Sequence, residues 1–83
     1  MLTIKVLGPG CPNCEKVEAA AKGAVASLGV EAEIIKITDY GEIRQYNVLA
    51  TPGLVVNEKL VAAGRIPSQA EVTTWVADAL ETA

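Results

Sequence analysis

Two cysteines, Cys11 and Cys14, are the residues of this chain with the clearest capacity for chemistry. They lie where an apolar strand is predicted to give way to a helix. The first amides of a helix have no partners within it, and the helix dipole presents positive partial charge there. Such a site stabilises a thiolate, the form of cysteine that attacks disulfides and binds soft metals. The pair therefore predicts disulfide exchange, metal binding or a structural bridge.

The composition excludes several other classes of function. The 83 residues carry a formal net charge of −3, with acidic and basic residues interspersed along the chain. We find neither the basic patch of a nucleic-acid-binding protein nor a cationic amphipathic helix that would bind a membrane surface. Histidine is absent, which excludes Cys–His and Ser–His catalysis. We expect no cofactor, and nothing in the sequence demands more than a monomer.

The first residues of the chain help to predict the cellular compartment of the protein. Residues 1–7 read as a strand and lack the charged region, long apolar region and cleavage site of a signal peptide. No apolar run approaches the length of a transmembrane span, so we expect no membrane insertion. The expected location is the cytoplasm, where lasting structural disulfides are rare. This argues against a static bridge between Cys11 and Cys14.

The predicted elements follow the order β-α-β-α-β-β-α in a single domain, residues 1–83. The first strand–helix–strand unit predicts parallel pairing with a right-handed crossover, and the later hairpin adds antiparallel strands. The result is an α/β fold with a mixed four-stranded sheet flanked by three helices. Strands are predicted at 2–7, 30–37, 54–57 and 59–63, and helices at 12–28, 40–46 and after Ser68.

Helical periodicity predicts which side chains are buried. On the first helix, Glu15, Lys16, Glu18 and Lys22 are expected to face water. Two capping boxes, Asp39 with Glu42 and Ser68 with Glu71, are expected to start the second and third helices. The predicted apolar faces are Val17, Ala20, Ala21, Ala24, Val25 and Leu28 on the first helix, Tyr40, Ile43 and Tyr46 on the second, and Val72, Trp75, Val76, Ala79 and Leu80 on the third.

The order of elements, the Cys11-Pro12-Asn13-Cys14 motif and Thr51-Pro52 together resemble the thioredoxin superfamily, and most closely its small, glutaredoxin-sized members in archaea and bacteria. The resemblance covers essentially the whole chain. It implies a thioredoxin-like fold, a thiol–disulfide oxidoreductase, and a cis Pro52 lying against the dithiol. Thr51 would then present backbone polar groups to a bound substrate chain, beside Pro12 and Asn13.

On this redox interpretation, Cys11 is the nucleophile because it is nearer the helix start and follows the small Gly10. Its thiolate attacks a substrate disulfide, and Cys14 then resolves the mixed disulfide. The expected partners are disulfide-containing protein substrates and a reductase that donates electrons. The sequence leaves open whether the electrons come from a thioredoxin reductase or from glutathione.

The sequence also departs from the patterns of the family. Thioredoxins carry a buried acid six residues before the first cysteine, where this chain has Lys5. An ammonium that reaches the dithiol favours the thiolate, whereas a lysine that extends toward solvent has no such effect. Glutaredoxins bind glutathione with a Gly-Gly and an acid after the last strand, but this chain has Gly64-Arg65 there. Arg65 is expected either to receive a carboxylate or to be solvated.

A metal chaperone is the alternative. Residues 3–28 also resemble a heavy-metal-associated domain, in which a strand, a Gly-rich loop, a C-x-x-C and a helix follow in the same order. Two thiolates suit Cu(I). Such domains usually carry a Met two residues before the first cysteine, where this chain has Pro9, and they end in a strand. The amphipathic helix predicted at the end of this chain favours the redox interpretation.

Overall fold

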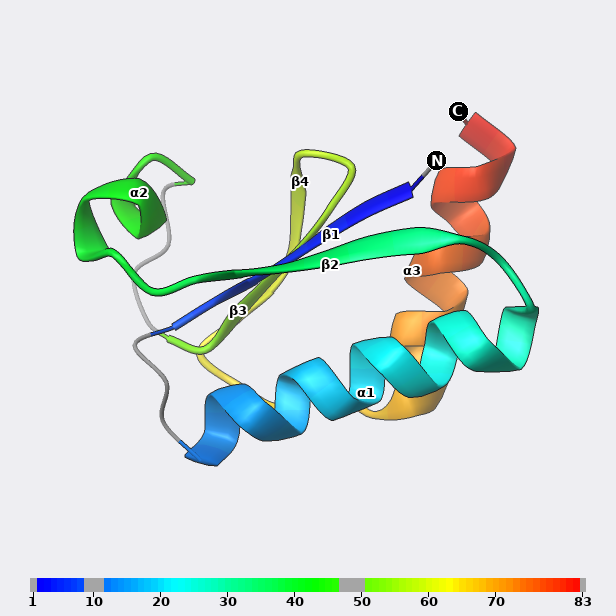
Figure 1. The fold of residues 1–83 in the computed structure, drawn as a ribbon, viewed down its shortest axis with the longest axis horizontal. Coiled ribbons are helices and arrows are strands. Elements are labelled where there is room, and N and C mark those ends of the chain that lie inside the picture. The colour runs from blue at the N-terminus through cyan, green and yellow to red at the C-terminus, as the bar shows by residue number, and fades with distance from the viewer. Residues whose placement is uncertain (1, 9–11, 47–50, 83) are drawn as a thin grey trace.

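Seven elements follow one another in the predicted order β-α-β-α-β-β-α (Figure 1). The computed structural model describes residues 2–8, 12–46 and 51–82. The elements are β1 (Leu2–Leu7), α1 (Pro12–Leu28), β2 (Ala32–Ile37), α2 (Tyr40–Arg44), β3 (Gly53–Val56), β4 (Lys59–Ala63) and α3 (Gln69–Thr82). None of these helices combines the length and the apolar character needed to cross a bilayer, within the described ranges.

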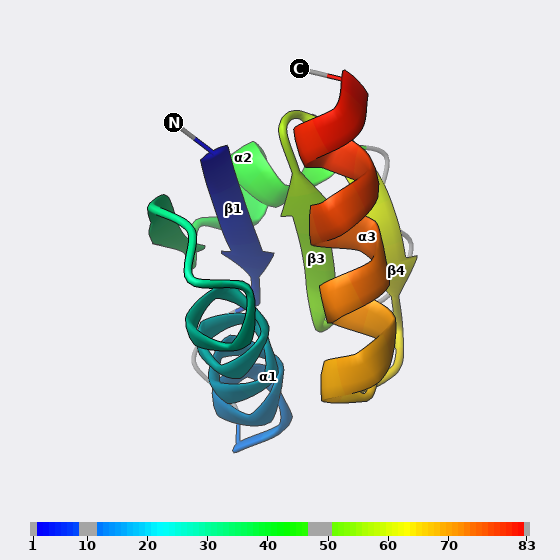
Figure 2. The same cartoon turned by 90° about the vertical axis from the view of Figure 1, so that its right-hand side faces the viewer.

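The four strands form one mixed sheet in the order β2-β1-β3-β4, which confirms the predicted sheet. β1 pairs in parallel with β2 and antiparallel with β3, and β3 pairs antiparallel with β4. Figure 2 shows α1 and α3 side by side in front of the sheet, with α2 behind it. The sheet therefore has an α1/α3 face and an α2 face.

Alternation along β1 divides its side chains between the two faces. Ile4 and Val6 join the larger buried cluster, on the α1/α3 face, whereas Leu7 packs with Ile43 and Val55 on the α2 face. The larger cluster consists mainly of small and β-branched side chains: Leu2, Ile4, Val6, Val17, Ala21, Ala24, Leu54, Val56, Ala62, Val72 and Val76. These small side chains bring α1 and α3 close to the sheet.

Three strand boundaries differ from the sequence prediction. β3 begins one residue earlier, at Gly53. The other two differ because neighbouring turns use the residues concerned. β2 begins at Ala32 rather than at residue 30. The Val30 amide donates to the carbonyl of Val25, and Gly29 adopts a left-handed φ of 65°, so both residues close the end of α1. β3 ends at Val56 because Asn57 and Glu58 form the hairpin turn with φ values of 49° and 68°.

Two side chains predicted to be buried are exposed instead. Tyr40 is 59% exposed because α2 has only five residues, and its one buried residue is Ile43. Leu80 is 42% exposed, and Figure 2 shows the C-terminal end of α3 projecting past β3. Helical spacing predicts a face for each side chain, but it does not predict where the facing sheet ends.

The capping box at the start of α3 forms as predicted. The Glu71 amide donates to Oγ of Ser68 at 3.2 Å, and the Ser68 amide donates to Oε1 of Glu71 at 3.2 Å. Arg65 donates two further hydrogen bonds to the same carboxylate, at 3.1 and 2.7 Å. The Arg65 bonds and the Ser68 amide lower the pKa of Glu71 to about 2. Arg65 is thus bound to a carboxylate of its own chain.

Candidate active site

Cys14 lies buried in the first turn of α1, against Gly8 and near Pro52. Its side chain packs against Gly8 at the end of β1, so closely that a Cβ on Gly8 would overlap the Cys14 sulfur. The same Cβ would lie 4.0 Å from Cα of Pro52. We call this junction of Gly8, Cys14 and Pro52 the Cys14 corner. It brings the second cysteine of the motif and the Thr51-Pro52 segment to one place.

Backbone hydrogen bonds hold the strands around this corner. The Gly8 amide donates to the carbonyl of Ile37 at 2.9 Å, which joins the ends of β1 and β2. The Gly64 amide donates to the carbonyl of Pro52 at 2.8 Å, which joins the start of β3 to the end of β4. Gly64 has a φ of 74°, a conformation in which glycine avoids the strain of other residues.

The predicted site residues differ in exposure. Pro12 and Asn13 are exposed at the start of α1, Thr51 is partly buried, and Pro52 is buried. The Thr51–Pro52 peptide bond is cis, which confirms that expectation from the family resemblance. Cys14 is in its disulfide-bonded form. Cys11 lies outside the described residues, so its pairing with Cys14 stays a prediction.

A small pocket of about 40 Å³ opens beside Cys14, which is room for one or two water molecules. We call it the Cys14 pocket. Its lining residues are Val6, Gly8, Cys14, Glu15, Glu18, Lys36 and Thr38. The pocket thus places two carboxylates and one ammonium group around the buried cysteine, a grouping that the sequence analysis missed.

Glu18 is the central charged group of this pocket. Its carboxylate lies 3.2 Å from Nζ of Lys36 in β2 and 3.4 Å from Nζ of Lys22, one turn further along α1. The Glu18 side chain is only 16% exposed, although the helical pattern predicted that it faces water. The hydrogen bond from Lys36, followed by that from Lys22, lowers the pKa of Glu18 below its ordinary value. The carboxylate is therefore ionised at neutral pH.

Lys5 lies on the other face of the sheet. Its ammonium donates to the Tyr46 hydroxyl and to Oε1 of Glu58, each at 2.6 Å. The bond to Glu58, followed by that to Tyr46, raises the pKa of Lys5 above its ordinary value. The Lys5 ammonium therefore points away from the Cys14 corner and is bound by Tyr46 and Glu58.

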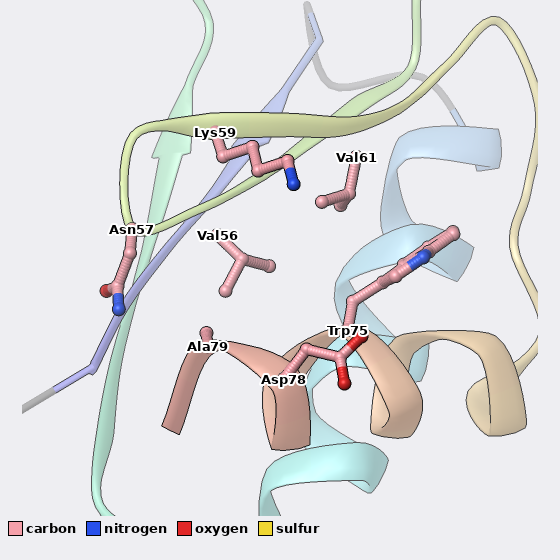
Figure 3. A pocket seen from close by; sticks show the side chains of 7 residues that line it. All are labelled: Val56, Asn57, Lys59, Val61, Trp75, Asp78 and Ala79. Carbon is pink, nitrogen blue, oxygen red and sulfur yellow. The ribbon is translucent and has the colours of Figure 1, made fainter. Parts of the chain in front are cut away.

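A larger pocket, of about 180 Å³, lies between the β3–β4 hairpin and α3 (Figure 3). Val56, Val61, Trp75 and Ala79 form its apolar wall, and Asn57, Lys59 and Asp78 form its polar rim. It contains none of the residues predicted to act in catalysis or substrate binding. Volume alone therefore does not identify the reactive part of this molecule.

Comparison with known proteins assigns the family. Residues 2–77 match the model of the thioredoxin domain. A thioredoxin of Methanocaldococcus jannaschii is 40% identical over 81 residues, which cover 98% of this chain and 93% of that protein. A thioredoxin of Methanothermobacter thermautotrophicus is 39% identical over 72 residues, covering 87% and 94% of the two chains. Neither match supports the metal-chaperone alternative.

A solved structure supports the fold independently. The protein titled "Structure of a malarial protein" superimposes with a TM-score of 0.69, covering 94% of this chain and 96% of that one. Because the two are 12% identical, this likeness concerns the fold alone. The family match and the two close relatives carry the assignment: this chain belongs to the thioredoxin family and is a thiol–disulfide oxidoreductase.

Proposed function

We propose that Cys11 and Cys14 form the redox-active dithiol of this protein and that it reduces disulfides in other proteins. The single observation that carries the proposal is the placement of Cys14, which is buried in the first turn of α1 against Gly8 and beside Pro52. A thiol in the first turn of a helix is favoured as thiolate by the free amides and the helix dipole. Membership of the thioredoxin family supports the same assignment.

The reaction proceeds in two exchanges. The Cys11 thiolate attacks one sulfur of the substrate disulfide, forms a mixed disulfide and releases the other substrate sulfur as a thiolate, which takes up a proton. The Cys14 thiolate then attacks the Cys11 sulfur and releases the second substrate thiol. Two electrons and two protons pass to the substrate, and the protein is left with a Cys11–Cys14 disulfide.

The substrate surface is proposed to surround the motif. Pro12 and Asn13 are exposed on the first turn of α1, and Thr51 precedes the buried Pro52. Ile66, which is 40% exposed between β4 and α3, adds an apolar side chain two residues after Gly64. A protein segment docked here would present its disulfide to Cys11.

The catalytic cycle needs an electron donor. A reductase that accepts a protein disulfide as its substrate returns the pair to the dithiol state, and whether it is a flavin thioredoxin reductase or a glutathione system is open. The cytoplasmic location predicted from the sequence would favour the reducing direction, because thiols are kept reduced there. That location stays a prediction.

Reduction of insulin disulfides, followed by turbidity in the presence of dithiothreitol, tests the proposal. We expect Cys11→Ser to abolish the activity above background. Cys14→Ser should accumulate a mixed disulfide with the substrate, visible on a non-reducing gel, because the resolving thiol is missing. Circular dichroism of each variant controls for folding. Activity retained in Cys11→Ser, or tight stoichiometric Cu(I) binding by a wild-type protein that reduces no disulfide, would contradict the proposal.

A further inference from the structure

We propose that the ion pair of Glu18 and Lys36 controls the ionisation of the Cys14 thiol in the reduced protein. Lys36 favours the thiolate and Glu18 opposes it. The proposal deepens the proposed function, since it assigns positioning residues to the resolving cysteine. Both side chains are proposed to act through their charge in the Cys14 pocket.

The geometry places both charges on the side of the sheet that carries Cys14. Glu18 follows Cys14 by four residues in α1, and side chains at this spacing are neighbours on a helix surface. Lys36 is the register partner of Val6, and directly paired residues of adjacent strands share a face. Val6 belongs to the α1/α3 face, so Lys36 reaches the same face from β2. Glu18, Lys36 and Cys14 accordingly line one pocket.

The electrostatic effect of Glu18 and Lys36 on the Cys14 thiol depends on how close and how exposed the two groups are. The pocket is small, with room for only one or two water molecules, so the charged groups that line it lie close to the cysteine. The Glu18 side chain is 16% exposed and that of Lys36 is 58% exposed. Loss of the lysine would leave a poorly solvated carboxylate facing the thiol, and loss of the glutamate would leave an unbalanced ammonium group.

Among the other described groups that face Cys14, Glu15 is the one further charge, and its carboxylate acts in the same direction as Glu18. In the described ranges, α1 contributes Glu15 and Glu18 to the pocket, and β2 contributes Lys36 together with the hydroxyl of Thr38. β1 contributes only Val6 and Gly8, and Pro52 packs nearby without a charge. Lys22 acts through Glu18, since it pairs with that carboxylate but does not line the pocket.

Control of this ionisation matters because the second exchange requires Cys14 as a thiolate. A higher thiolate fraction shortens the lifetime of the mixed disulfide between Cys11 and substrate. A lower fraction prolongs it. The pair would therefore set the time for which this protein stays covalently attached to its substrate.

The thiolate absorbance of Cys14, followed against pH in a Cys11→Ser background, tests the proposal directly. We expect Glu18→Gln to lower the pKa of Cys14 by about half a unit to one unit, which raises the thiolate fraction below that pKa about threefold to tenfold. Lys36→Gln should raise the pKa by a similar amount. The double variant should return close to the background value.

Two matched variants isolate the pocket from a general effect of charge. Lys5→Gln removes a lysine that also pairs with a glutamate but from the opposite face of the sheet, and it should leave the pKa of Cys14 unchanged. Lys22→Gln removes the second partner of Glu18 and should act in the same direction as Lys36→Gln, but more weakly. Melting curves confirm that each variant is folded at the temperature of the titration.

Shifts of opposite sign in Glu18→Gln and Lys36→Gln support the proposal. Shifts of the same sign, no shift in either, or a shift in Lys5→Gln as large as that in Lys36→Gln would overturn it. The titration needs no disulfide substrate, so its outcome is separate from that of the insulin assay. A protein that reduces insulin normally but shows no such shifts keeps its proposed function and refutes the control by Glu18 and Lys36.

Discussion

The two faces of the sheet differ in how they are covered and in how they treat charge. Two helices cover the α1/α3 face over a large apolar cluster, and three charged groups line the Cys14 pocket on this side of the sheet. The short α2 covers the other face over only Leu7, Ile43 and Val55, beside the bonded group of Lys5, Tyr46 and Glu58. The α1/α3 face thus carries both the larger buried cluster and the Cys14 pocket, whereas the α2 face carries only the smaller cluster.

This difference shows which lysine can influence the dithiol. Lys5 occupies the position, six residues before Cys11, at which thioredoxins are expected to place an acid, but its neighbours Ile4 and Val6 take the side of the sheet that faces α1. Alternation therefore sends Lys5 to the opposite face. Lys36 shares a face with Val6 and lines the Cys14 pocket. The face of the sheet on which a lysine lies, rather than its distance from the cysteines along the sequence, therefore decides whether it lines the Cys14 pocket.

The largest expected effect tests the unequal cores. Leu54 is fully buried in the cluster on the α1/α3 face, so Leu54→Ala should lower the free energy of unfolding by about 2–5 kcal/mol. In the Leu54→Ala variant, amide hydrogen exchange should accelerate in all helices and strands. Ile43→Ala should accelerate exchange mainly in residues 40–44, because a five-residue helix with one buried side chain can open locally. Urea denaturation and amide hydrogen exchange measure the two effects.

The comparison would fail if Ile43→Ala accelerated exchange as widely as Leu54→Ala. That result would show the two clusters to be one cooperative core. Circular dichroism of both variants in the absence of urea controls for unfolding before the exchange measurement begins.

A second test concerns the close packing of the Cys14 corner. Gly8→Ala adds a Cβ where the Cys14 sulfur already lies, and we expect it to lower the free energy of unfolding by about 1–3 kcal/mol and to impair disulfide reduction. Gly23→Ala is the matched control in α1. Its new Cβ meets the far end of the flexible Gln69 side chain, and alanine favours the helix by about 0.5–1 kcal/mol.

Denaturation midpoints and insulin reduction of the two glycine variants give the result. Equal stability losses in Gly8→Ala and Gly23→Ala would show that the corner is no more tightly packed than the middle of the helix. A stable Gly8→Ala variant with full activity would show that neither folding nor disulfide reduction requires the close packing of Gly8 against Cys14.

The smallest expected effect is an acid dependence at the start of α3. The folded pKa of Glu71, about 2, lies below its ordinary value, so its bonds to Arg65 and Ser68 stabilise the fold fully above about pH 4.5. That stability is lost as the pH falls from there toward about 2. Glu71→Gln should therefore lose less stability on acidification than the wild type. Urea denaturation at several pH values checks this, and parallel pH profiles would contradict it.

Much of the fold follows from local patterns in the sequence. Gly29 and the Ser68–Glu71 box mark a helix end and a helix start, and both form as predicted. The cis bond at Pro52 followed from the family resemblance and is confirmed. Tyr40 and Leu80 were assigned to buried faces wrongly, because burial depends on how far a neighbouring element extends.

The Cys14 pocket was beyond reach of the sequence for a related reason. Glu18 carries the four-residue spacing from Cys14 that places both on one side of α1, and this was a usable signal. Its partner Lys36 comes from β2, and that contact depends on the register of β1 with β2. Periodicity within α1 alone therefore assigned Glu18 to solvent. The part of the site around Cys11 stays a prediction.

The hydrogen bond from the Gly64 amide to the Pro52 carbonyl would transmit a pulling force from the start of β3 to the end of β4. A protein chain pulling on the loop at Thr51 would draw on the start of β3 and, through this bond, on the end of β4. The next residue, Arg65, is fastened to Glu71 by two hydrogen bonds, so the tension would continue into the first turn of α3. If Thr51 contacts the substrate as proposed, the load from a bound partner would be shared by the β3–β4 hairpin and the first turn of α3.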